Sequence, residues 1–195
     1  MLKHASNTTK NLQHIRCRYQ PVHDRIRVTG ELEDESSEAF WLTRRMVAQI
    51  VPHLAQYIEK QTGDKMDTML ADVKAQLAKS QQEQSDIRWR ESAETSPTAQ
   101  PESTTSSLQT PSPVPWLAVK MNLTSTNTGC RLVFHGEGGE SASVTLRVQP
   151  LCRWLAVLHA QSQHAQWQSQ SWPAWVSELM AASAVPALPT SAVLH

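Results

Sequence analysis

The chain has 195 residues with 18 basic and 18 acidic side chains, so its formal net charge is zero. A balanced charge excludes the overall positive field that steers a protein onto nucleic acid or an anionic membrane, and any charged site then requires local segregation of charge. No apolar run approaches the roughly 20 residues that span a bilayer, and the N-terminal region carries basic side chains where a signal sequence has an apolar core. We expect a soluble, cytoplasmic protein with no membrane partner.

Two strands of alternating polarity open the predicted fold. Residues 15–19 read Ile-Arg-Cys-Arg-Tyr, and residues 25–32 continue the alternation with apolar side chains on one side and arginines on the other. Pro21 and Asp24 lie between the two runs, and both residue types favour turns. The pattern predicts a hairpin.

A third strand and a helix follow. The strand is expected over residues 39–43, after an acidic turn, and Thr43 is suited to cap the helix. Apolar residues then recur at the three- and four-residue spacing that is typical of one helix face: Val47, Ile50, Val51, Leu54 and Ile58. Pro52 lies inside this helix and is expected to bend it.

A second amphipathic helix is predicted over residues 64–83, after Gly63, which favours a helix end. The composition then changes, because residues 92–115 consist almost entirely of Ser, Thr, Pro, Gln and Glu. Such a segment cannot bury enough apolar surface to offset the entropy of ordering. We predict a disordered linker over residues 92–115.

The pattern of the first segment recurs after the linker. A gap-free shift of 104 residues superimposes the apolar positions, pairing Ile26 with Cys130, Val28 with Leu132, Phe40 with Val144, Val47 with Leu151 and Leu54 with Leu158. We interpret residues 12–61 and 116–167 as two copies of one β-β-β-α unit. Each copy is too small to be stable alone, so the two are expected to pack together.

The expected fold class is therefore α+β, with two pseudo-symmetric β-β-β-α units, antiparallel sheets, an inserted amphipathic helix and the disordered linker. A short helix over residues 171–182, begun by Pro173, and a flexible tail over residues 183–195 complete the prediction.

No catalytic or metal-binding set is recognisable in the sequence. The glycine cluster at residues 136–139 falls where a hairpin turn is expected, and His159 and His164 are too far apart to share a helix face. The cysteines occupy apolar positions and are interpreted as buried, reduced thiols: Cys17, Cys130 and Cys152. We expect no enzyme activity, cofactor or metal, although an enzyme whose site is assembled from distant residues stays open.

One arrangement of charge stands out. If the apolar residues of the first three strands face inward, the period of two directs their basic residues outward, together with an indole. This candidate binding surface comprises Arg16, Arg18, Arg25, Arg27, Trp41 and Thr43. The equivalent face of the second unit is basic but thinner, with Lys120, Arg131 and Arg147.

Such a surface suits single-stranded nucleic acid, because guanidinium groups pair with phosphates and an exposed indole stacks on a base. The strand and helix order also resembles, in topology alone, the single-strand-binding folds of the Pur and positive-cofactor-four families, whose units have four strands where three are predicted here. The alternative is a solvated face whose arginines are neutralised by the adjacent carboxylates: Glu31, Glu33, Asp34, Glu35 and Glu38.

The missing catalytic set, seven tryptophans and a Met-containing helix favour a non-enzymatic protein-interaction module, acting as an accessory or assembly factor. Its protein partner is unknown from the sequence. Single-stranded nucleic-acid binding is the alternative function, and further homodimerisation stays open.

Overall fold

The structure, a computed structural model, describes residues 9–79, 113–167 and 172–181. The strands of the first half are β1 (Lys10–Leu12), β2 (Ile15–Gln20), β3 (Arg25–Glu31) and β4 (Ser37–Leu42). Helix α1 (Arg44–Thr62), the 3-10 turn η1 (Gly63–Lys65) and a helix over residues 66–79 follow. The second half contains β5 (Trp116–Ser125), β6 (Cys130–Gly136), β7 (Ser141–Leu146), α3 (Val148–His164) and α4 (Ala174–Ala181).

The predicted α+β class is confirmed by these elements. Most of the predicted linker, residues 92–112, lies outside the described residues, as does the predicted tail over 183–195. The predicted second helix continues to residue 83, and its last part also lies outside them.

The described strands form one seven-stranded sheet in the order β1-β7-β6-β5-β4-β3-β2. Strands β2 to β4 and strands β5 to β7 are two antiparallel meanders, as expected. The expectation of antiparallel sheets is corrected at two places, because β4 pairs with β5 in parallel and β1 pairs with β7 in parallel. Parallel neighbours need a crossover connection, and the chain between β4 and β5 contains helix α1.

The sheet closes on itself at a bend between β1 and β2. Only Gln13 and His14 separate these strands, although they stand at opposite ends of the strand order. The Gln13 amide donates to the Glu31 carbonyl (2.8 Å) and the Glu31 amide donates to the His14 carbonyl (3.1 Å), which carries the β2–β3 pairing up to the bend. The Leu12 side chain packs where a Cβ on Gly30 would stand, 2.8 Å from Leu12 Cδ1. Glycine is therefore needed at this close approach.

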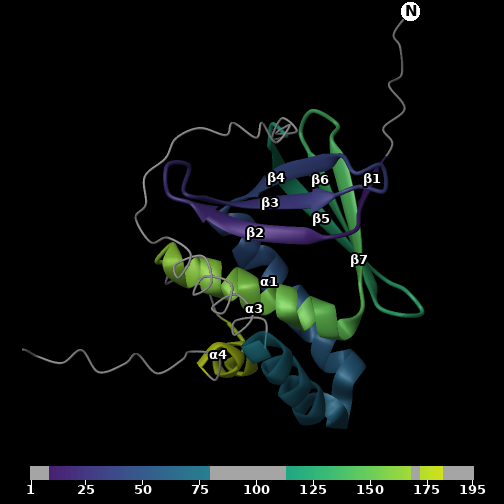
Figure 1. The fold of residues 1–195 in the computed structure, drawn as a ribbon, viewed down its shortest axis with the longest axis vertical. Coiled ribbons are helices and arrows are strands. Elements are labelled where there is room, and N and C mark those ends of the chain that lie inside the picture. Colours follow the sequence, from purple (N-terminus) through teal and green to yellow (C-terminus); the bar gives the residue numbers. More distant parts are fainter. Residues whose placement is uncertain (1–8, 80–112, 168–171, 182–195) are drawn as a thin grey trace, which may run out of the picture.

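The core lies between the concave face of the sheet and the two long helices. Helices α1 and α3 lie side by side beneath the strands, and α4 packs against α3 (Figure 1). All five residues of the predicted apolar stripe of α1 are buried. The Thr43 side chain accepts a hydrogen bond from the Met46 amide (3.1 Å), which confirms the predicted N-cap, and α1 ends at Gly63 with a φ of +48°.

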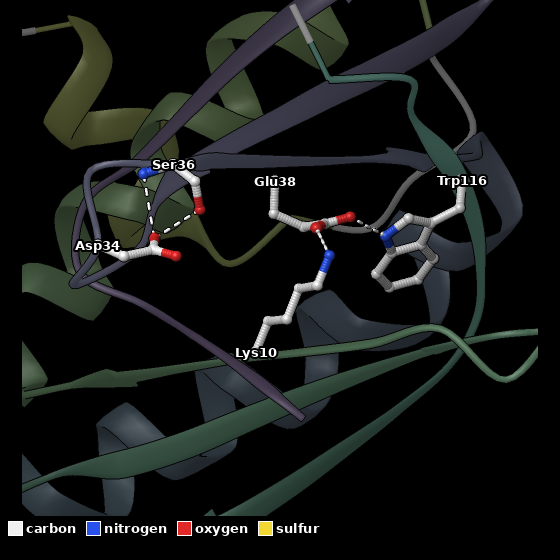
Figure 2. Close-up of polar contacts among 5 residues, drawn as sticks. All are labelled: Lys10, Asp34, Ser36, Glu38 and Trp116. Atoms are coloured by element: carbon white, nitrogen blue, oxygen red, sulfur yellow. Dashed lines mark hydrogen bonds and ion pairs between the residues drawn. The ribbon is translucent and has the colours of Figure 1, made fainter. Parts of the chain in front are cut away.

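A polar cluster links strands β1, β4 and β5. Figure 2 shows the Glu38 carboxylate between the Lys10 ammonium, with which it forms an ion pair, and the Trp116 indole, which donates to it at 2.8 Å. The predicted role of Glu38 as a turn residue that neutralises arginines is wrong. Glu38 lies on β4, opposite the buried Gly30, and period-two geometry directs its side chain inward.

Candidate functional site

The outer face of strands β2, β3 and β4 carries the arginines that the sequence pattern placed there. In the strand register Arg18 lies opposite Arg27, and Arg27 lies opposite Trp41, so these three side chains form one row across the sheet. On the same face, Arg25 lies opposite Gln20 in one neighbouring row, and Arg16 lies opposite Thr29 in the other neighbouring row. The use of this face for binding stays a prediction.

Most carboxylates of the acidic turn form contacts with groups other than the arginines of this face. Glu31 lies 3.6 Å from Arg16, with both side chains well exposed, so the attraction is weak. Other carboxylates of the turn have partners elsewhere: Glu33 with Gln13, Asp34 with Ser36, and Glu38 with Lys10 and Trp116. The Asp34–Ser36 contacts, drawn in Figure 2, close the turn and lower the pKa of Asp34.

Parts of the row are already engaged. The His23 ring lies 4.9 Å from the Trp41 ring, and the Arg27 guanidinium donates to the Pro113 carbonyl (2.9 Å). The Thr43 hydroxyl is occupied as the cap of α1. Arg16 and Arg18 are the most exposed members of the predicted surface. The open part of the face is therefore smaller than the sequence pattern suggested.

The three predicted residues of the second half lie in different settings. The Arg131 guanidinium donates to the Ser143 hydroxyl (3.1 Å) on the outer face of β6 and β7. Arg147 is exposed at the N-cap position of α3, where its side chain makes no capping bond. Lys120 lies in β5 and lines a groove that the sequence analysis missed.

This groove exists because β5 is longer than the strand beside it. Strand β5 pairs with β6 from Ala118 to Ser125, but it pairs with β4 only at Trp116 and Leu117. Strand β4 ends at Leu42, where the chain enters α1. Within the part of the chain that the structure describes, no strand pairs with this edge of β5 beyond Leu117.

A β-bulge turns the free part of β5 away from β4. The β5–β6 register shifts between Ala118 and Lys120, which makes Val119 the extra residue, and its side chain is 43% exposed. At the other end, the Tyr57 hydroxyl donates to the Gly129 carbonyl (2.6 Å) in the turn before β6. This bond holds α1 over the hairpin and bounds the groove.

The groove has a volume of about 920 Å³ between α1 and the free edge of β5. Its helix wall is one stripe of α1: Met46, Gln49, Ile50, His53, Gln56, Tyr57 and Lys60. Its strand wall is six consecutive residues: Val119, Lys120, Met121, Asn122, Leu123 and Thr124. Because neighbouring strand residues point to opposite faces, a run of consecutive lining residues means that the backbone edge itself lines the groove.

The groove is also electropositive. It is lined by Lys60, Lys120 and His53, and none of the described lining residues is Asp or Glu. The sequence held one signal for such a site, namely the length of β5, in which an apolar run from Trp116 to Val119 and an alternating run to Ser125 make ten residues against the five predicted for the third strand. A strand that outlasts its neighbour leaves backbone groups without a ladder partner.

Cys130 and Cys152 are buried as predicted, whereas Cys17 is half-buried, and none of the three thiols forms a nucleophilic site. Burial raises the pKa of Cys17 to about 12, that of Cys152 to about 12 and that of Cys130 to about 11, although the Trp154 indole donates to the Cys17 sulfur (3.1 Å). A thiol with so high a pKa holds its proton at neutral pH, and the thiolate is the reactive form. In the described ranges, no group of three or more His, Cys, Asp or Glu residues could hold a metal ion.

Comparison of the chain with protein-family models, with curated proteins and with solved structures gave no match. No helix in the described residues is both long enough and apolar enough to cross a membrane. A functional assignment therefore depends on the geometry of the two surfaces described above.

Proposed function

We propose that this protein is a non-enzymatic interaction module, an accessory or assembly factor whose docking site for a protein partner is the groove between α1 and β5. The observation that carries the proposal is the backbone edge of β5 at Val119 to Thr124, which no described strand pairs with and which faces a mixed polar and apolar stripe of α1. An unpaired sheet edge is a common way to bind an extended segment of another protein, because the main-chain groups of the edge form hydrogen bonds with the added strand.

The two halves of the chain strengthen this proposal when they are compared. We propose that they are copies of one unit, because adding 104 to the bounds of β4 and to the start of α1 gives the bounds of β7 and the start of α3. The counterpart of β5 is then β2. One edge of β2 pairs with β3, and its other edge faces α3, where the Tyr19 amide donates to the Gln161 side chain (2.7 Å). Helix α3 thus contacts this edge of β2, whereas no described strand pairs with the corresponding edge of β5 beyond Leu117.

Site-specific photocrosslinking tests this function. A benzophenone amino acid replaces Val119 in the groove, and in a matched control it replaces Val22, which is 90% exposed in the β2–β3 turn. In cells that produce the protein, we expect a discrete crosslinked protein from position 119 and none from position 22, with the crosslink mapped by mass spectrometry. Equal crosslinking at both positions, or none at position 119, overturns the proposal.

Single-stranded nucleic acid is the second candidate, favoured by the row of Arg18, Arg27 and Trp41 on the outer face. We expect fluorescence anisotropy to show micromolar binding of labelled single-stranded DNA or RNA that weakens with salt, because phosphate contacts release counterions. The variant R16E/R18E should abolish this binding, and K60E/K79E, which changes two exposed lysines outside the predicted surface, should leave it intact. Binding that is absent at low salt, or that prefers duplex, rules this candidate out.

A cytoplasmic location completes the proposal, and further homodimerisation stays open. The buried, unpaired thiols of Cys130 and Cys152 fit a reducing compartment. Size-exclusion chromatography with light scattering measures the oligomeric state directly.

A further inference from the structure

We infer that the groove takes an extended segment of a partner protein that alternates acidic and apolar residues and adds to β5 as a further strand. This inference rests on the proposed function and names the chemical class of the partner. It is carried by three features of the groove, which are its backbone edge, the accessible apolar residues among its lining and its charge.

The backbone edge supplies hydrogen-bonding groups at the spacing of a strand. In an antiparallel pair every second residue directs its N–H and C=O at the partner strand, and the residues between direct theirs away. About three of the six residues from Val119 to Thr124 therefore point both groups toward the groove. This edge is about 20 Å long, which is the length of a six-residue extended segment.

The helix side of the groove matches the strand edge in length. The stripe of α1 from Met46 to Lys60 spans about 20 Å, because a helix rises about 1.5 Å per residue. Met46 and Ile50 are buried, so the apolar lining residues that remain accessible are Tyr57 from the helix and Val119, Met121 and Leu123 from the strand. Methionine adapts its shape to different partners, so these positions suit alternate apolar residues of an added strand.

The charge of the groove favours an acidic partner and disfavours a second copy of this chain. Lys60 and Lys120 face the groove without a carboxylate among its described lining residues. If two copies paired through β5, each would bring its own Lys120 to the contact, and like charges at an edge oppose pairing. Carboxylates on the outer face of an incoming strand would instead lie beside Lys120, which points to the same face of the sheet.

The test uses the full-length protein and a fluorescein-labelled peptide, Asp-Val-Glu-Ile-Glu-Val-Asp-Leu. The matched control peptide carries Lys at every acidic position. Two further peptides carry backbone N-methyl groups, one on all acidic positions and the other on all apolar positions. Because only alternate amides of an added strand face β5, we expect one methylated peptide to lose binding and the other to keep it.

Matched protein variants test the charge. The double variant K60E/K120E reverses the groove charge at two exposed residues, and K60E/K79E makes the same change in charge with only one residue in the groove. We expect K60E/K120E to raise the dissociation constant of the acidic peptide by about tenfold or more, and K60E/K79E to raise it clearly less. Hydrogen exchange should show new protection of amides within residues 119–124 on binding.

The outcomes separate this inference from the proposed function. Equal binding of the lysine peptide, equal behaviour of the two methylated peptides, or protection outside β5 overturns strand addition by an acidic segment. A dimer that dissociates in K60E/K120E overturns it in favour of a second copy. If the acidic peptide does not bind but position 119 still crosslinks one protein, the inference fails and the proposed function stands. If both experiments are negative, both fail.

Discussion

Glu38 is the residue whose environment differs most from what its neighbours in the sequence suggest. It lies in an acidic stretch that is otherwise exposed, yet its own side chain is buried and is shared by Lys10 and Trp116 (Figure 2). The bonds join β1, β4 and β5, which are far apart in the sequence. A buried carboxylate of this kind is favourable only while its partners remain in place.

We predict that E38A lowers the free energy of unfolding by about 1–3 kcal/mol, because the Trp116 indole and the Lys10 ammonium lose their acceptor. Urea denaturation followed by tryptophan fluorescence measures this. E33A, which removes an exposed turn carboxylate, is the control and should change stability by less than about 0.5 kcal/mol. Equal losses in the two variants would contradict the structural role of Glu38.

His159 gives a prediction about pH. It is buried on α3, its ring lies 4.9 Å from the Trp172 ring, and burial lowers its pKa below the usual 6.5. The unfolded chain therefore takes up a proton near pH 6.5 while the folded chain does not. Stability is fully present above this pH and falls as the pH drops below 6.5 toward the pKa of the folded state.

We predict that H159Q is more stable relative to the wild type at pH 5 than at pH 7. The measurement is urea denaturation of both proteins at the two pH values. H14Q, at an exposed histidine, is the control and should show no such difference. A stability difference between H159Q and the wild type that does not change with pH would refute the prediction.

At the scale of the elements, the bend between β1 and β2 closes the sheet. It requires the Leu12 side chain to occupy the space beside Gly30. The short β1 pairs with β7 over only three residues, so this packing contributes much of what holds β1 in place.

We predict that G30A lowers the free energy of unfolding by about 1–3 kcal/mol, because the new methyl group overpacks against Leu12. In an L12A background part of this cost should disappear, since two of the three close atoms belong to the end of the Leu12 side chain. Thermal denaturation of the four proteins of the cycle measures the coupling. Additive effects would mean that the two residues do not interact.

At the scale of the whole molecule, the two halves share one core. Phe40 stacks on Trp116 at 5.0 Å and lies 4.7 Å from Phe134, so a first-half strand packs on two second-half strands. The Trp154 indole donates to Cys17 in the same way across the halves. Neither half closes the sheet without the other.

We predict that a fragment of residues 1–79 shows no cooperative unfolding transition alone and gains one when mixed with a fragment of residues 113–195. The reason is that a unit of this size buries too little apolar surface to be stable by itself. Near-ultraviolet circular dichroism and thermal denaturation follow the change. A sharp transition of the first fragment alone would show that the halves are independent domains.

Local pattern was enough for much of the fold. The alternation in residues 25–32 predicted that Ile26 and Val28 face the core, and the helical spacing after Thr43 predicted both the buried stripe and the cap. The apolar settings of the cysteines were also predicted correctly for Cys130 and Cys152, which are buried. These properties depend on neighbours within a few residues, which a sequence displays directly.

The sequence by itself determined the α+β class, the inward and outward faces of the strands and the apolar face of α1. Only the tertiary structure decided that the sheet closes at Gln13 and His14, that β4 and β5 run parallel and that Glu38 turns inward. It alone decided that β5 outlasts β4 and leaves a groove beside α1. The physical reason is that periodicity sets which face of a strand is apolar, whereas the partner of each strand edge depends on packing between residues about a hundred positions apart.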